Sequence, residues 1–147
     1  MIVAGVAFIG GSYLAFGPGA AVSGQTALRA GDPEAVALGA DVYAASCAAC
    51  HGVDLEGQPE WRSPGPDGRL PAPPHDETGH TWHHDGDALF RLTKYGVGSI
   101  VGDPNYASNM PVYEGVLTDE EIVAALSYIK STWPREIRDR HDAMQGR

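Results

Sequence analysis

Cysteine is nearly absent from this chain of 147 residues, which has only two. Two cysteines are too few for a domain held together by a disulfide scaffold. Basic side chains are also scarce, since ten Lys and Arg stand against nineteen Asp and Glu and give a formal net charge of −9. Nucleic-acid binding depends on basic groups that neutralise phosphates, so this balance argues against a nucleic-acid partner. It favours protein partners with basic docking patches.

Alternating strand patterns and repeats with a period of 20–50 residues are also missing, which predicts a mostly α fold. Asp32-Pro33-Glu34 is a helix start, and apolar residues at helical spacing extend that helix to about residue 49. A second helix is expected to begin at Asp85 and to end at Gly96. Thr118 and Glu121 form a capping box for the last helix. Its apolar stripe consists of Ile122, Leu126, Ile129 and Trp133.

Residues 52–79 form the longest irregular stretch and contain more than half of the chain's eleven prolines. Such a stretch cannot be a regular helix or a central strand. A long loop in a small domain needs something to pack against, and a large planar cofactor would serve. We therefore expect three to five helices joined by long loops around a cofactor.

The N-terminus has no charged side chain from residue 2 to 22. Residues 1–23 are interpreted as a membrane anchor or as a cleaved signal segment, and a buried helix of a soluble domain is the third alternative. The first two alternatives send the rest of the chain across a membrane. Residues 24–31 then form a linker, 32–133 a single domain and 134–147 a charged tail with a weak helical pattern.

The two cysteines lie three residues apart and a histidine follows, in the sequence Cys47-Ala48-Ala49-Cys50-His51. A disulfide enzyme would place such a pair after a strand, and a zinc site would need further ligands. C-x-x-C-H is also the attachment signal for c-type haem. Cysteines at i and i+3 lie on one helical face, where both sulfurs can bond one porphyrin, and the adjacent histidine can hold the iron.

From residue 33 to 133 the chain resembles the class I c-type cytochromes, whose fold surrounds one covalently bound haem. Gly39, Tyr43 and Cys47 match the glycine–aromatic–cysteine spacing of that family, whose glycine lets the first helix cross closely against the last. "LSYIK" at 126–130 resembles the family's final helix, and "SNMPVY" at 108–113 resembles its methionine loop.

The resemblance implies that His51 and Met110 are the two axial ligands of the iron. A methionine that fills a gap in the core is the alternative for Met110. Trp82 and Tyr95 are candidates for contact with the haem propionates or for lining the pocket. A His/Met pair raises the reduction potential and closes the iron to substrates, which favours electron transfer over enzymatic catalysis.

Four histidines gather in "HDETGHTWHHDG", namely His75, His80, His83 and His84. One interpretation is a second metal site for copper or zinc, since imidazole suits both. The other is that these rings bind the propionates or the loop backbone.

The predicted function is electron transfer between redox proteins by a single haem c, on the periplasmic side of the cytoplasmic membrane or in the periplasm. Covalent haem is normally attached after export, which fits that location. Two alternatives remain open: a haem subunit of a stable respiratory or copper-oxidase complex, and a haem-based redox or ligand sensor.

Overall fold

The computed structural model describes residues 26–144, and within that range the chain is helical and has no strand. The helices are α1 (Pro33–Ser46), α2 (Ala48–His51), α3 (Gly86–Tyr95), α4 (Gly98–Val101), α5 (Asp119–Thr132) and α6 (Arg135–Asp142), with one 3-10 turn, η1 (Thr81–His83). The mostly α prediction is confirmed. There are more helices than the three to five expected, because two of them, α2 and α4, are single turns of four residues.

The expected membrane or signal segment at 1–23 lies outside the described residues. Between residues 26 and 144, no helix is long and apolar enough to cross a membrane.

Helix α1 begins where the sequence predicts and ends earlier. Asp32 caps it, because the carboxylate accepts hydrogen bonds from the amides of Glu34 and Ala35. The predicted helix over 33–49 breaks at Cys47, whose φ of −121° is not helical, and the chain resumes as α2. The break places the cysteine pair on a separate turn.

Helices α3 and α5 follow their predicted boundaries. The Asp85 carboxylate accepts from the amide of Ala88, and Gly96 ends α3 with a φ of +86°, a conformation that glycine adopts without strain. Thr118 and Glu121 form the complete capping box of α5. The stretch after Gly96 contains the single turn α4.

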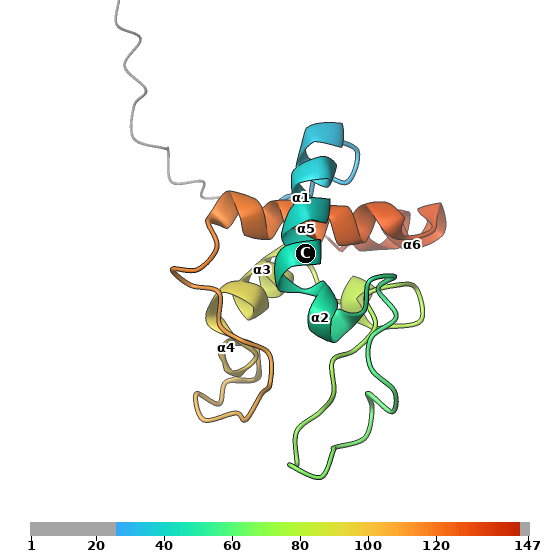
Figure 1. Ribbon diagram of the computed structural model, residues 1–147. Coiled ribbons are helices and arrows are strands. Elements are labelled where there is room, and N and C mark those ends of the chain that lie inside the picture. Colours follow the sequence, from blue (N-terminus) through green and yellow to red (C-terminus); the bar gives the residue numbers. More distant parts are fainter. Residues whose placement is uncertain (1–25, 145–147) are drawn as a thin grey trace, which may run out of the picture.

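Helix α1 packs across α5, and the two cross at Gly39 (Figure 1). A Cβ atom at Gly39 would lie 2.0 Å from the carbonyl oxygen of Ala124 and 2.8 Å from the Cβ of Tyr128. Only glycine permits this approach of the two backbones, as the resemblance implies.

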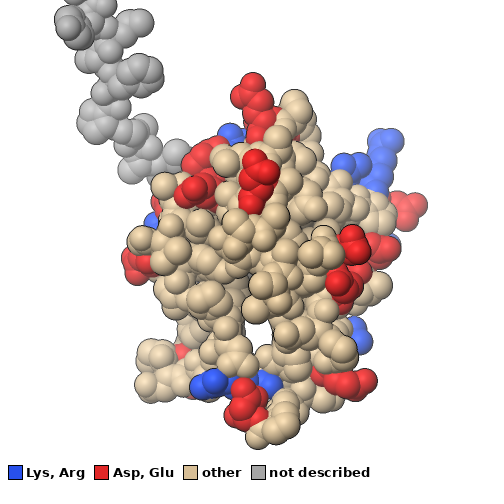
Figure 2. Space-filling view, in the orientation of Figure 1, with Lys and Arg blue, Asp and Glu red and all other residues tan. Residues whose placement is uncertain are grey.

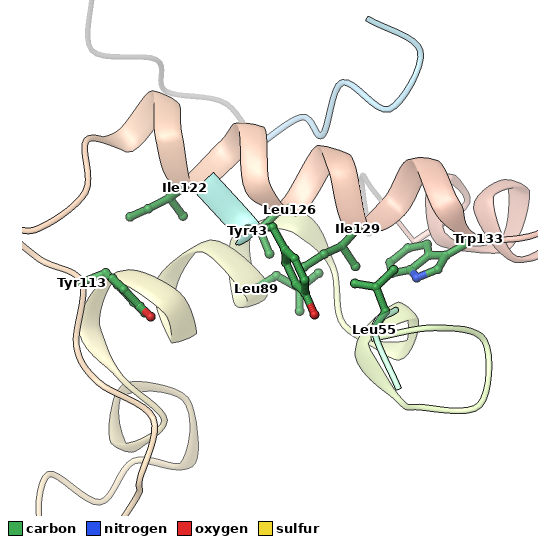
Figure 3. Packing of buried hydrophobic residues seen from close by; sticks show 8 residues of the cluster. All are labelled: Tyr43, Leu55, Leu89, Tyr113, Ile122, Leu126, Ile129 and Trp133. Atoms are coloured by element: carbon green, nitrogen blue, oxygen red, sulfur yellow. The ribbon is translucent and has the colours of Figure 1, made fainter. Parts of the chain in front are cut away.

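The core lies on the side of α5 that faces α1 and α3 (Figure 3). Its buried residues are Tyr43, Leu55, Leu89, Tyr113, Ile122, Leu126, Ile129 and Trp133. All four residues of the predicted α5 stripe belong to it. Helix α6 extends from α5 and is joined to it by an ion pair between the buried Lys130 and Asp142.

Replacing Gly39 by alanine is expected to lower the free energy of unfolding by about 3 kcal/mol or more, because backbone atoms of α5 cannot yield to the added carbon. Gly31→Ala is the matched control, since nothing lies within 4 Å of a Cβ there. Its effect is expected to stay within about 0.5 kcal/mol. Chemical denaturation of both variants gives the comparison, and equal midpoints would contradict the close crossing.

Candidate functional site

Cys47 joins α1 to α2, and Cys50 lies in the single turn of α2. The amides of Cys50 and His51 both donate to the carbonyl of Cys47, at 3.1 and 3.0 Å, which closes the turn. Both thiols are free, with Cys47 half-buried and Cys50 exposed. Burial raises the pKa of the Cys47 thiol to about 11, and the nearby Cys50 adds to this. A disulfide enzyme places its cysteine pair after a strand, and residues 26–144 contain no strand, so the disulfide-enzyme interpretation does not fit.

Two tyrosines hold this turn from either end. The buried Tyr43 donates its hydroxyl hydrogen bond to the carbonyl of Gly52, at 2.8 Å. Tyr113, also buried, donates to the carbonyl of Ser46. The first tyrosine was singled out from its spacing, whereas nothing in the sequence around Tyr113 indicates its role.

His51 is buried, and its Nδ1 lies 2.9 Å from the carbonyl oxygen of Pro73. A carbonyl can only accept, so Nδ1 carries the proton and Nε2 keeps its lone pair. Burial lowers the pKa of His51, although the bond to Pro73 opposes this shift. A neutral, oriented imidazole with a free Nε2 is what a metal requires of a histidine ligand.

A second imidazole supports the first. The ring of His75 stacks on that of His51, with centroids 4.0 Å apart and planes inclined by 20°. His75 is fixed in turn by a hydrogen bond of 2.7 Å between its Nδ1 and the Thr81 hydroxyl. Its carbonyl accepts from the Trp133 indole, also at 2.7 Å. Sequence reasoning grouped His75 with the other histidines and did not single out Pro73, because neither residue stands at a diagnostic spacing.

The remaining histidines of the predicted cluster face different partners. His80 stacks on Trp61 at 5.2 Å, and His83 stacks on Trp82 at 3.7 Å. Across residues 26–144, no three or more His, Cys, Asp and Glu side chains are grouped so that they could hold a metal. The arrangement therefore supports structural roles for these rings rather than a second copper or zinc site.

Met110 and Tyr95 line one pocket of about 580 Å³ beside α4. Met110 is partly buried and packs against the core, whereas Tyr95 is 44% exposed. Trp82 also packs against the core, but its indole N–H donates to the carbonyl of Glu77 at 3.3 Å. A role for Trp82 or Tyr95 at the propionates stays a prediction.

Below the helices in Figure 1, the loop that follows α4 lies on the left and the loop that follows α2 lies on the right. In the same orientation, the space-filling view shows an opening between them, bordered mainly by uncharged atoms, with charged side chains below it (Figure 2). Two free cysteines three residues apart, followed by an oriented histidine, fit the residues that attach a c-type haem. Neither the cysteines nor His51 line the pocket that contains Met110.

The family comparison agrees with this arrangement. The cytochrome c family matches residues 36–133, which is more than half of the chain. The chain belongs to the cytochrome c family. Members transfer electrons through a covalently bound haem c, and Cys47 and Cys50 followed by His51 fit the attachment motif. Searches of curated proteins and of solved structures found no match.

Replacing both Cys47 and Cys50 by serine is expected to abolish haem staining of the protein on a denaturing gel, because no thioether can form. Each single variant should keep one thioether and mature poorly. Ala49→Ser, at an exposed position between the two thiols, is the control and should stain like the wild type. Full staining of the double variant would refute attachment at this turn.

Proposed function

We propose that this protein is a single-haem electron carrier in which His51 and Met110 would both hold the haem iron. The observation that carries the proposal is the His51 imidazole, which is buried, neutral and oriented by the Pro73 carbonyl. Met110 supports the proposal, because it is partly buried and lines a pocket. Met144, in contrast, lies in the charged tail.

The haem, when bound, supplies the one-electron couple between ferric and ferrous iron. The residues of the chain set the conditions for that couple. His51 would offer the Nε2 lone pair from a ring whose rotation is restricted, because the Pro73 carbonyl holds Nδ1 and His75 stacks on one ring face. Met110 would supply a thioether, which favours the reduced state and raises the potential. If His51 and Met110 both bind, they would leave no position for a substrate, and the protein would then pass electrons without binding one.

The electric charge of the chain supports partners with basic docking patches. The net charge is −9, and acidic side chains lie over the upper part and the edges of the face that contains the opening, with basic and acidic side chains directly below it (Figure 2). An excess of negative charge attracts a basic partner over long range. We further propose that the carrier acts on the periplasmic side of the cytoplasmic membrane or in the periplasm, on the basis of the uncharged stretch from residue 2 to 22.

Met110→Ala is expected to remove the far-red charge-transfer band that methionine sulfur gives to ferric haem, and to let the ferrous protein bind CO readily. Met144→Ala removes a methionine that follows α6, outside the pocket of Met110, and should leave both properties unchanged. Optical spectra of the purified holoproteins test this. If the wild type lacks the band and binds CO as fast as Met110→Ala, the electron-carrier proposal fails and a ligand sensor is favoured.

The acidic surface predicts the response to small oxidants. The reduced protein should react faster with a cationic cobalt(III) complex than with an anionic complex of matched driving force. The difference should shrink as salt shortens the Debye length from about 30 Å at 0.01 M to about 3 Å at 1 M. Stopped-flow oxidation at several ionic strengths measures it. A faster reaction with the anionic complex at low salt would show that the region around the haem is not acidic.

A further inference from the structure

The loop of residues 57–72 has a defined shape although it contains no helix or strand. It is closed at its neck, where the Gln58 amide donates to the carbonyl of Ala72 at 2.8 Å. The Gln58 side chain accepts from the Ala72 amide in return, at 2.9 Å. Nearer the tip, the Gly65 amide donates to the carbonyl of Arg69, also at 2.8 Å. The loop therefore presents its tip in a fixed direction.

The tip reaches the methionine segment, residues 108–113. The Arg69 guanidinium donates to the Asn109 side-chain oxygen at 2.8 Å, and the Asn109 side-chain nitrogen donates to the Asp67 carboxylate at 3.2 Å. The Arg69 amide donates to the same carboxylate, at 3.0 Å. These bonds lower the pKa of Asp67, so the carboxylate is ionised at neutral pH. Both ends of the Asn109 amide are thus engaged, which fixes its orientation.

Asn109 directly precedes Met110, and its side chain joins this part of the chain to the loop of residues 57–72. Within the described chain, every hydrogen bond that joins residues 104–112 to another segment involves the Asn109 side chain. The Met110 amide is bonded only locally, to the Ser108 hydroxyl at 3.0 Å. Tyr113, at the far end of the segment, donates its amide to the carbonyl of Thr93 at 3.3 Å and its hydroxyl to the carbonyl of Ser46. Asn109 is therefore the anchor next to the methionine, and Tyr113 is the anchor three residues further on.

We propose that Asp67, Arg69 and Asn109 form a latch that keeps the methionine segment in place, so that Arg69 and Asn109 are positioning residues for Met110. This inference rests on the proposed ligation by His51 and Met110. The latch residues are exposed, and exposed ion pairs contribute little to global stability. Their effect is instead local, because opening of the segment and release of Met110 are opposed by few other bonds.

The test compares holoprotein variants by the rate at which CO binds to the ferrous form, since CO can enter only while Met110 is away from the iron. A typical net hydrogen bond corresponds to roughly a fivefold change in an equilibrium constant. Arg69→Ala and Asn109→Ala should therefore each bind CO about five times faster than the wild type. The far-red band of the ferric form should also disappear at a lower pH in both variants.

Arg62→Ala is the matched control. It removes a positive charge from the same loop, where Arg62 lies 4.1 Å over the Trp61 ring, but it breaks no bond to Asn109. Its CO rate should stay within about twofold of the wild type. If Arg69→Ala and Asn109→Ala also stay within that range, the latch is refuted while the ligation by Met110 stands.

A double variant separates the latch from unrelated effects. Because Arg69 and Asn109 act through one shared contact, the combined variant should bind CO no more than about twofold faster than either single one. Full multiplication of the two effects would mean that the residues act independently, which contradicts the proposal. A wild type that lacks the far-red band and binds CO like Met110→Ala would refute the ligation itself, and with it the latch.

Discussion

The close crossing of α1 and α5 is the constraint on which the other features of the site depend. Gly39 allows the two backbones to approach closely. Tyr43 follows one helical turn later and lies in the core beside Tyr128, with ring centroids 5.5 Å apart. The Tyr43 hydroxyl reaches the carbonyl of Gly52 beyond the cysteine turn. The position of the attachment motif is thus set by helix packing at its start, before any cofactor contact is made.

Aromatic stacking organises the proline-rich chain after the motif. His51 stacks on His75, and His80 stacks on Trp61. The backbone of His75 is held by Leu55 and Trp133 through its amide and its carbonyl. Buried backbone groups of a stretch without regular secondary structure need individual hydrogen-bond partners of this kind or water. His75 and His80 thus both take part in contacts that order this loop.

The parts of the fold that depend on local sequence could be predicted. The caps at Asp32, Asp85 and Thr118 placed three helix starts correctly, because capping is decided by neighbouring residues. The family's glycine spacing also indicated the crossing at Gly39. The break at Cys47 was missed, since alanines on both sides favour a continuous helix and only tertiary contacts of the turn oppose it.

The contacts that orient the site were harder to predict. Pro73 and Tyr113 act on residues 22 and 67 positions away, and no local pattern encodes such partners. The same holds for Asn109, whose partners lie about forty residues earlier. The paired bonds between Gln58 and Ala72 have one more consequence. They bring the ends of the long loop together independently of what lies between, and closure entropy rises only slowly with loop length. Insertions and deletions between Gln58 and Ala72 can therefore leave His51 in place, whereas any that move Asp67 or Arg69 would separate the loop from Asn109.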